Sequence, residues 1–551
     1  MSTRKVTLNQ LATEPFDALI LGGGINGAVS AAALAAQGAK VALIDRGDFA
    51  IGSSSQSSNL AWGGIKYMES GELLLVQKLC RSRNHLMDNY PSRVKEIRFF
   101  TTIKRGFRWP AWIIFCGAVL YWLMGACRTQ PPRFLSRRDI EREQPLIDAA
   151  AIAGGVEYSD CYLPGNDARF VFNFIRSAID NGAVVTNYVE ALGSHRDIDG
   201  TWVTNGRDRI NGQQLTIKAK VLVNACGPYV DGYNKNIGQL TQYQHVFSKG
   251  VHLIVPRLIA EEKILAFFAS DGRLFFVIPM GDCTCIGTTD TPEQDPAVEV
   301  SEDDRRFILD NANQLLRLQK PLTREDIIAE RCGVRPLVVK RGKNAQVDWL
   351  KLSRKHKIHN NRRDHYLSIF GGKITDCINV GDEVVEHCRQ FGILPAKEWQ
   401  KWYGEPDQAR KQQFMATATG YKLDRFEPDS SGGEGVAERW WRRFGERAYV
   451  LLEQVKKDPT VLQRPLPECD YSYCEIALMG QEECITTLDD FLRRRTKIAL
   501  MVPTTQLVNH PGLVEVAELL FGKETAGDKL HDYLQRVVGG EPPIVNKVVG
   551  A

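Results

Sequence analysis

The sequence predicts a mixed α/β fold in two domains. Three observations predict it: a strand–helix–strand pattern with a glycine-rich turn opens the chain, short strands joined by polar turns fill its middle, and charged helical segments end it. The length of 551 residues exceeds what one hydrophobic core usually holds, so two or more domains are expected.

The chain begins with a βαβ unit. Phe16 to Leu21 is a short apolar strand, and an alanine-rich helix follows it to about Gln37. A second apolar strand, Lys40 to Ile44, ends at Asp45. This order predicts two parallel strands joined by a crossover helix.

The middle of the chain contains shorter strands. Polar turns such as Asp199-Gly200 and Gly281-Asp282 separate apolar runs, which is typical of antiparallel pairing and predicts an antiparallel-sheet subdomain. We expect strands at residues 184–196, 202–205, 214–217, 220–224, 275–279 and 284–287.

The composition changes after about Lys397. From there Arg, Lys, Glu, Gln and Trp recur at helical spacing, as in RRFGERAYVLLEQV and LDDFLRRRTKIAL. We therefore expect an α/β domain over residues 1–395, with its binding segments interleaved, and a C-terminal helical domain over residues 396–551.

One segment, residues 109–127, contains no charged residue and approaches the length of a membrane span. Pro110 and two glycines argue against a span, so the first interpretation is a buried helix. The second interpretation is a helix lying in the membrane interface, anchored by Trp109, Trp112, Tyr121 and Trp122. The third interpretation is a true membrane span.

Bulk composition narrows the function. The chain has 70 basic and 66 acidic side chains, and its net charge of +4 is too small to indicate a nucleic-acid partner. Its 13 cysteines are scattered without a CxxC pair, so we expect neither a metal site nor a disulfide framework. The N-terminal residues lack an apolar signal core, and a reducing, cytoplasmic setting is expected.

The turn after the first strand, GGGINGA, fits the dinucleotide-binding pattern GxGxxG. Gly22 permits the tight turn, Gly24 lets the backbone approach a pyrophosphate, and Gly27 lets helix and strand pack closely. The helix N-terminus offers free N–H groups and partial positive charge to phosphates. Asp45 can accept hydrogen bonds from an adenosine ribose, so a Rossmann-type site is predicted.

Two distant strand ends also carry glycines, in VLVNACGPYV and YLSIFGGKIT. In flavoproteins of this build, distant segments return to one sheet and close on one long cofactor, which favours FAD over NAD. Gly371 and Gly372 precede a helix predicted from Ile374 to His387. Its N-terminus would stabilise the negative charge of a reduced flavin.

These segments resemble the FAD-dependent glycerol-3-phosphate dehydrogenases, a family within the D-amino-acid-oxidase-like flavoproteins. The resemblance covers most of the chain. It rests on motifs in the family's order: GGGINGA, a serine-rich loop ending in GGIKYM, YSDCYLPGNDAR, NACGPYVD, SKGVHLIVPR, FFVIPMGDCTCIGTTD, GVRPL, SIFGGKIT and the C-terminal LRRRTK.

The resemblance implies a hydride transfer. The secondary alcohol carbon of sn-glycerol 3-phosphate would give hydride to flavin N5 while a base takes the hydroxyl proton, and dihydroxyacetone phosphate would leave. Electrons would pass to a quinone or another acceptor such as oxygen. The expected partners are a phosphorylated polyol and an acceptor at or near the inner face of the cytoplasmic membrane. Peripheral membrane contact and a homodimer are left open.

The resemblance also implies roles for individual residues. A phosphate dianion needs fixed cations, and Arg335 in GVRPL matches the family's substrate-binding arginine. Lys373 matches the lysine of the family's GGK motif, and His252 could orient the substrate or take the proton. Lys66 and Tyr67 complete the catalytic set. FAD is assigned to Gly22, Gly24, Ile25, Asn26, Gly27, Asp45, Arg46, Ser54, Ser55, Ser58, Asn59, Ala225, Gly227, Gly371, Gly372, Lys373, Ile374 and Thr375.

The sequence departs from the family's pattern beside the substrate. Where the family has K-L-[IV]-H-G-G-[LI]-R-Y-L, this chain has Trp62 for the histidine and Lys66 for the arginine. The family's GGKLTTYR becomes GGKITDCI, which introduces Asp376. Indole cannot accept a proton, and lysine lacks the bidentate fork of arginine.

Three functions therefore stay open. The main prediction is oxidation of glycerol 3-phosphate with another base, which is His252, Tyr67 or Lys373. The second is an oxidase or dehydrogenase whose pocket is reshaped for another small hydroxy or amino acid. The third is a protein that binds flavin without turnover. Trp62 either packs against the flavin, closes the pocket or belongs to the core.

Overall fold

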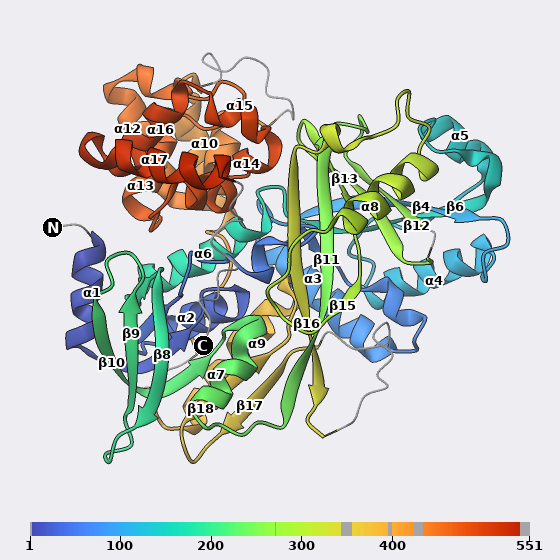
Figure 1. Ribbon diagram of the computed structural model, residues 1–551. Coiled ribbons are helices and arrows are strands. Elements are labelled where there is room, and N and C mark those ends of the chain that lie inside the picture. Colours follow the sequence, from blue (N-terminus) through green and yellow to red (C-terminus); the bar gives the residue numbers. More distant parts are fainter. Residues whose placement is uncertain (1–2, 270, 343–354, 395–398, 424–433, 540–551) are drawn as a thin grey trace.

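The computed structural model describes residues 3–269, 271–342, 355–394, 399–423 and 434–539. Two sheets lie side by side, and a group of helices at the C-terminal end of the chain packs beside them (Figure 1). The mixed α/β fold with a helical C-terminal part is therefore confirmed. The domain boundary predicted at residues 395–396 lies outside the described residues.

The first sheet holds the predicted βαβ unit. Strand β1 (Pro15–Leu21) pairs in parallel with β2 (Val41–Ile44) and β10 (Gln214–Asn224), and α2 (Ile25–Ala36) connects the first two. The sheet also contains β17 (Lys357–Asn361), β18 (Tyr366–Phe370), β7 (Val184–Thr186), β8 (Val189–Arg196) and β9 (Trp202–Asp208).

The two strands predicted at 214–217 and 220–224 form one continuous strand, β10, so their separation is wrong. Its first half pairs antiparallel with β9, and its second half lies parallel to β1. Alternate residues are buried along the first half, whereas every residue from Val221 to Asn224 is buried. The change of burial pattern within one strand explains why the sequence reads as two elements.

Buried helices cover one face of this sheet. Helix α2 packs between α6 (Asp167–Asp180) and α9 (Cys377–Gln390), and its alanines allow close approach. On the other face, α1 (Thr3–Thr13), which the sequence did not predict, packs against β10 and β7 through Leu8 and Leu11.

The second sheet is mostly antiparallel, and β12 (Lys263–Phe268) and β4 (Lys95–Lys104) form a parallel pair. Strand β11 (Tyr243–Pro256) pairs with β16 (Ala329–Lys340) along most of its length, and the predicted hairpin of β13 (Leu274–Met280) and β14 (Cys283–Gly287) is confirmed. The remaining strands are β3 (Leu60–Ala61), β5 (Arg133–Leu135), β6 (Ile152–Tyr162) and β15 (Thr291–Glu293). Its helices are α3 (Leu73–Asn89), α4 (Ala111–Met124), α5 (Arg137–Glu143) and α8 (Glu302–Leu315). Helix α7 (Val230–Asn236) packs against β10 and β18 of the first sheet.

The C-terminal helices have a core of their own, centred on Trp440, Trp441 and Phe491. They are α10 (Gln408–Thr419), α11 (Val436–Phe444), α12 (Ala448–Lys457), α13 (Tyr473–Glu482), α14 (Ile498–Met501), α15 (Thr504–Val508), α16 (Gly512–Phe521) and α17 (Lys523–Val538).

A buried charge cluster joins these helices to the loop after β2. Asp48 receives Arg494 Nε at 2.6 Å and Arg495 Nη2 at 2.8 Å, and all three side chains are almost fully buried. Burial opposes the ionisation of Asp48, but the two guanidinium groups outweigh it and lower its pKa to about 2. The motif LRRRTK therefore acts as a structural link between the two parts.

Helix α4 lies on the surface, so the interpretation of residues 109–127 as a buried helix is wrong. Only Ala111, Ala118 and Tyr121 of this helix are buried, and they face β6 and α3. Its outer face leaves Trp112 61% exposed and Leu123 54% exposed. Among the described residues, no helix combines the length and apolar character that a membrane crossing requires.

Candidate active site

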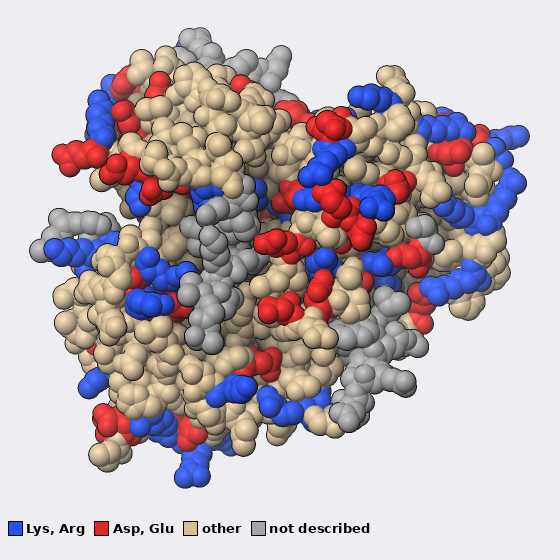
Figure 2. Space-filling view, in the orientation of Figure 1, with Lys and Arg blue, Asp and Glu red and all other residues tan. Residues whose placement is uncertain are grey.

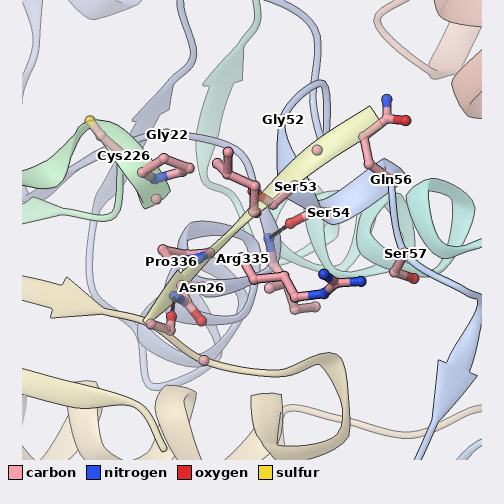
Figure 3. A pocket seen from close by; sticks show the side chains of 18 of the residues that line it. Gly22, Asn26, Gly52, Ser53, Ser54, Gln56, Ser57, Cys226, Arg335 and Pro336 are labelled. Atoms are coloured by element: carbon pink, nitrogen blue, oxygen red, sulfur yellow. Dashed lines mark hydrogen bonds between the residues drawn. The ribbon is translucent and has the colours of Figure 1, made fainter. Parts of the chain in front are cut away.

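A cavity of about 640 Å³ lies between the two sheets, at the ends of β1, β2, β10 and β18. The turn at Gly22, the serine-rich loop at Ser53 to Ser57 and strand β16 at Arg335 converge on it (Figure 3). These segments are far apart in the sequence, so the fold alone brings them together.

The glycine-rich turn makes the closest main-chain contacts at the cavity. Gly22 has a φ of +99°, and a Cβ atom there would lie 2.6 Å from the Ala225 carbonyl oxygen. A Cβ atom at Gly27 would lie only 1.8 Å from the Gly22 oxygen. Gly22 and Gly24 line the cavity, whereas Gly27 lies behind them, at the packing position that the sequence predicts.

The first turn of α2 points at the cavity. The N-cap residue is Gly24, which has no side chain that could cap the helix. Ser54 Oγ accepts the N–H of Ile25 at 3.0 Å. Asn26 Nδ2 donates to the Gly371 oxygen at 2.8 Å, and among the described residues Asn26 Oδ1 has no hydrogen-bond partner. This helix end is therefore suited to an anionic, hydrogen-bonding group such as a pyrophosphate.

Asp45 forms the wall at one end of the cavity. Its carboxylate accepts the N–H groups of Gly23 at 2.6 Å and Gly47 at 2.8 Å. Burial raises the pKa of Asp45 to about 6, against the opposing effect of these N–H groups. Beside it the Arg46 guanidinium lies 3.9 Å from the ring centroid of Tyr229. A ribose and an adenine fit this combination of carboxylate and flat side chains.

The serine-rich loop is attached to the second sheet. Ser53 Oγ donates to the Val334 oxygen at 2.7 Å, and Ser58 Oγ lies 2.9 Å from His252 Nε2. Ser55 and Asn59 do not line the cavity: Ser55 turns to the Gly52 oxygen, and Asn59 Oδ1 accepts Arg331 Nη1 at 3.1 Å. These two residues hold the loop in shape instead of facing a cofactor.

The second glycine pair forms another main-chain wall. Gly371 and Gly372 have φ angles of +63° and +114°, which favour glycine. The helix predicted from Ile374 begins with one 3₁₀ turn, Ile374–Asp376, before α9. Ile374, Thr375, Ala225 and Gly227 line the cavity with the pair, so most of the predicted cofactor residues lie together.

The other end of the cavity is lined by side chains, with cations from four segments: Lys66, Arg273, Arg335 and Lys373. Lys373 Nζ lies 4.2 Å from the ring centroid of Tyr67, and Trp62 lies beside the same ring at 6.4 Å. Arg335 Nη1 donates to the Thr289 oxygen at 2.9 Å, and Nη2 donates to Thr288 Oγ1 at 2.8 Å. All of the predicted catalytic residues line this end.

Sequence reasoning missed several residues of this end. Arg273, Phe276, Thr288 and Asp290 line the cavity. The last three lie in the motif FFVIPMGDCTCIGTTD, which could have identified them, whereas the signal for Arg273 was its position beside a predicted hairpin strand. Asp290 lies 3.4 Å from Arg335 Nη1, so it helps to fix that guanidinium group.

His252 is a buried, neutral imidazole in this wall. Burial, and then the charges of Arg335 and Arg331, lower its pKa to about 3. Its Nε2 atom contacts Ser58, and among the described residues its Nδ1 atom has no hydrogen-bond partner. The ring is therefore uncharged at neutral pH and can accept a hydrogen bond, while its low pKa makes it a weak base.

Asp376, the acid that replaces a neutral residue of the family's pattern, points away from the cavity. Its carboxylate contacts His356 Nδ1 at 2.8 Å, Ser82 Oγ at 3.0 Å and Lys78 Nζ at 3.4 Å. Burial opposes its ionisation, but the hydrogen bond and charge of His356 lower the pKa of Asp376 to about 2. This substitution therefore adds a structural contact and no charge to the substrate end.

Comparisons with known proteins agree with this geometry. Residues 17–361 match the family model described as FAD dependent oxidoreductase, and residues 408–526 match the C-terminal domain of alpha-glycerophosphate oxidase. The chain is 30% identical to glycerol-3-phosphate dehydrogenase 2 of Mycobacterium tuberculosis over 550 residues, covering 97% of this chain and 90% of the relative.

It is also 30% identical to the aerobic glycerol-3-phosphate dehydrogenase of Escherichia coli, covering 90% of this chain and 96% of the relative. The solved glycerol-3-phosphate dehydrogenase of Bacillus halodurans complexed with FAD shares the fold, with a TM-score of 0.74, 22% identity and coverage of 100% and 99% of the two chains. FAD is the cofactor, and the cavity has the main-chain cradle that it needs. The chain belongs to the FAD-dependent glycerol-3-phosphate dehydrogenase family of oxidoreductases.

Proposed function

We propose that this enzyme oxidises sn-glycerol 3-phosphate to dihydroxyacetone phosphate and passes the electrons to a quinone at the membrane. The observation that carries this proposal is the cluster of Lys66, Arg273, Arg335 and Lys373 at the end of the cavity opposite the nucleotide cradle. Fixed cations in a partly enclosed site are suited to a small phosphorylated substrate.

The substrate phosphate would lie against Arg335 and Lys66. Thr288, Thr289 and Asp290 hold the Arg335 guanidinium in place, so little side-chain entropy is lost on binding. Lys66 has no such fork and supplies a point charge. We therefore expect Lys66 to contribute less to phosphate binding than Arg335 does.

FAD, when bound, supplies the hydride acceptor. The chain supplies the proton acceptor, and His252 is the residue that we assign to it, because its imidazole is neutral and faces the cavity. Ser58 Oγ lies 2.9 Å from Nε2 and fixes the ring beside the substrate end. Lys373 would polarise the substrate hydroxyl, while Trp62 and Tyr67 would exclude water.

Anaerobic reduction of the bound flavin tests the reaction. Addition of glycerol 3-phosphate to the purified holoenzyme should bleach the flavin absorbance, and glycerol 2-phosphate, small 2-hydroxy acids and amino acids should not. Turnover should then appear with a soluble quinone analogue. Bleaching by a hydroxy or amino acid alone would reject the phosphorylated substrate, and no bleaching by any of these would reject turnover.

The membrane part of the proposal rests on α4. Its 14 residues contain no charge, and Trp109, Trp112, Leu120 and Leu123 are between 44% and 61% exposed. Exposed basic residues flank it at Lys104, Arg105, Arg108 and Arg128. Lys and Arg side chains gather at the same end of the molecule, around α5 (Figure 2). Exposed indoles beside basic groups favour peripheral contact with an anionic bilayer.

Co-sedimentation with vesicles that contain phosphatidylglycerol tests this contact. The wild-type enzyme should sediment with the vesicles, and a Trp112→Asp, Leu123→Asp double variant should stay in the supernatant. The matched control is Val450→Asp, Val514→Asp, which places the same two charges on exposed apolar sites of α12 and α16. Equal sedimentation of the two double variants would reject α4 as the contact. A homodimer and a cytoplasmic location stay predictions.

A further inference from the structure

A second histidine, His245, lies directly behind the Gly371-Gly372-Lys373 turn, outside the cavity. It belongs to β11, and its side chain is fully buried. Its Nε2 atom accepts the Gly371 N–H at 3.0 Å. A main-chain N–H can only donate, so the lone pair of Nε2 must point at Gly371 and the ring proton must lie on Nδ1.

Asp231 of α7 fixes that tautomer. Its Oδ2 atom lies 2.8 Å from His245 Nδ1 and accepts the main-chain N–H of His245 at 3.0 Å. One carboxylate oxygen therefore holds both the backbone and the ring of the histidine. Phe370, whose ring centroid lies 5.1 Å from that of His245, and Phe247, at 6.1 Å, pack against the ring.

The turn is thereby held on two sides. Asn26 Nδ2 binds the Gly371 oxygen at 2.8 Å, and His245 binds the Gly371 nitrogen. The peptide groups flanking Gly371 are fixed by side chains from α2 and β11, elements of different parts of the sequence. The next two residues are Gly372 and Lys373, both of which line the cavity.

We propose that the Asp231–His245 pair is a positioning device for the Gly371–Lys373 turn, setting where its N–H groups meet the cofactor and where the Lys373 amine meets the substrate. Asp231 orients His245, His245 orients Gly371, and the positive-φ pair Gly371-Gly372 transmits that orientation to Lys373. The Lys373 part rests on the proposed function, whereas the cofactor part does not.

Two isosteric variants separate the contacts of the ring. Gln at position 245 can place an oxygen near the Nε2 position and keep the acceptor for Gly371, whereas Asn can reach only Asp231. We expect His245→Asn to weaken FAD binding to the apoprotein about tenfold, because a buried N–H loses its acceptor. His245→Gln should bind FAD within about threefold of wild type.

The kinetic readout is the split between kcat and KM. A displaced Lys373 should lower kcat about tenfold in His245→Asn with little change in KM, because substrate-phosphate binding by Arg335 stays intact. The matched control is His365→Asn, at a histidine that precedes β18, has a φ of +50° and stacks on Phe391. Its FAD affinity and kcat should equal those of wild type.

The pair is only structural if His245→Asn lowers the melting temperature but leaves FAD affinity and kcat unchanged, or if His245→Gln is as impaired as His245→Asn. If His245→Asn fails to fold, nitrogen NMR of ring-labelled histidine in the wild-type holoenzyme decides. The proposal expects a proton on Nδ1 and none on Nε2 of His245, and the reverse tautomer would overturn it. FAD affinity and the tautomer need no substrate, so a wrong substrate assignment cannot mimic either result.

Discussion

Main-chain atoms line one end of the cavity, and side chains line the other. At the nucleotide end, the main chain of Gly22, Gly24 and Gly371 forms the wall. A Cβ atom at Gly22 would collide with the Ala225 backbone, and one at Gly371 would collide with the Val338 side chain. At the substrate end, side chains such as Lys66 and Arg335 form the wall. The comparison teaches that a main-chain site restricts the sequence at its glycines, whereas a side-chain site can change its chemistry without changing the fold.

The largest expected effect concerns the main-chain end. Gly27→Val should abolish flavin binding, with at least about a 100-fold rise in the FAD dissociation constant, because the new side chain must displace the Gly22 carbonyl. Flavin absorbance of the purified protein measures it. The control is Gly232→Ala, a glycine that also lines the cavity but whose Cβ would meet open space. Retention of FAD by Gly27→Val would remove the main-chain argument.

The next effect concerns the side-chain end. Arg335→Ala should keep its flavin but lose about 2–3 kcal/mol of transition-state binding, or about 30- to 150-fold in kcat/KM for glycerol 3-phosphate. Arg335→Lys should recover part of the loss, because the charge returns without the fork. Steady-state kinetics with a quinone analogue measures both. An unchanged kcat/KM in Arg335→Ala would show that this arginine only holds Asp290 and Thr288.

Asp45 and His252, at the two ends of the cavity, should change the free energy of unfolding with pH in opposite directions. The pKa of Asp45 is raised from 3.8 to about 6, so the folded state holds a proton that the unfolded state releases, and the stability contribution is lost as pH rises through about 6. The pKa of His252 is lowered from 6.5 to about 3, so the unfolded state binds the extra proton and stability is lost as pH falls below 6.5.

For each of the two groups, the free energy of unfolding should change by up to about 1.4 kcal/mol per pH unit. Denaturant unfolding of the apoproteins between about pH 3 and pH 7, a range that covers both shifts, measures these changes. Relative to wild type, Asp45→Asn should gain stability as pH rises, and His252→Gln should gain it as pH falls. Parallel curves for the two variants would contradict the assignment.

The smallest expected effect is a gain in kcat/KM. Lys66→Arg restores the fork of the family's pattern and should raise kcat/KM for glycerol 3-phosphate about two- to fivefold, with FAD content unchanged. Trp62→His should add to it only if His252 is a poor base. A loss in Lys66→Arg would indicate that the pocket is shaped for the shorter lysine head and therefore for a different anion.

The same contrast explains what the sequence could predict. The glycine turns were predictable because only glycine allows their φ angles and contacts. The directions of Ser55, Asn59 and Asp376 were not. Ser55 turns to the Gly52 oxygen within its own loop, whereas contacts with Arg331 and His356, from other segments, hold Asn59 and Asp376 away from the cavity. Helix α4 was misread as buried because hydropathy measures apolar content and does not say what covers it.

The contact of Asp48 with Arg494 and Arg495 has a consequence for biosynthesis, because 446 and 447 positions separate the partners. When the nucleotide-binding strands leave the ribosome, the carboxylate that closes their loop has no guanidinium partner yet, and burying it alone would be costly. The nascent chain can therefore complete that loop only after its last helices emerge. We expect flavin loading to follow release of the finished polypeptide, which makes truncated chains colourless.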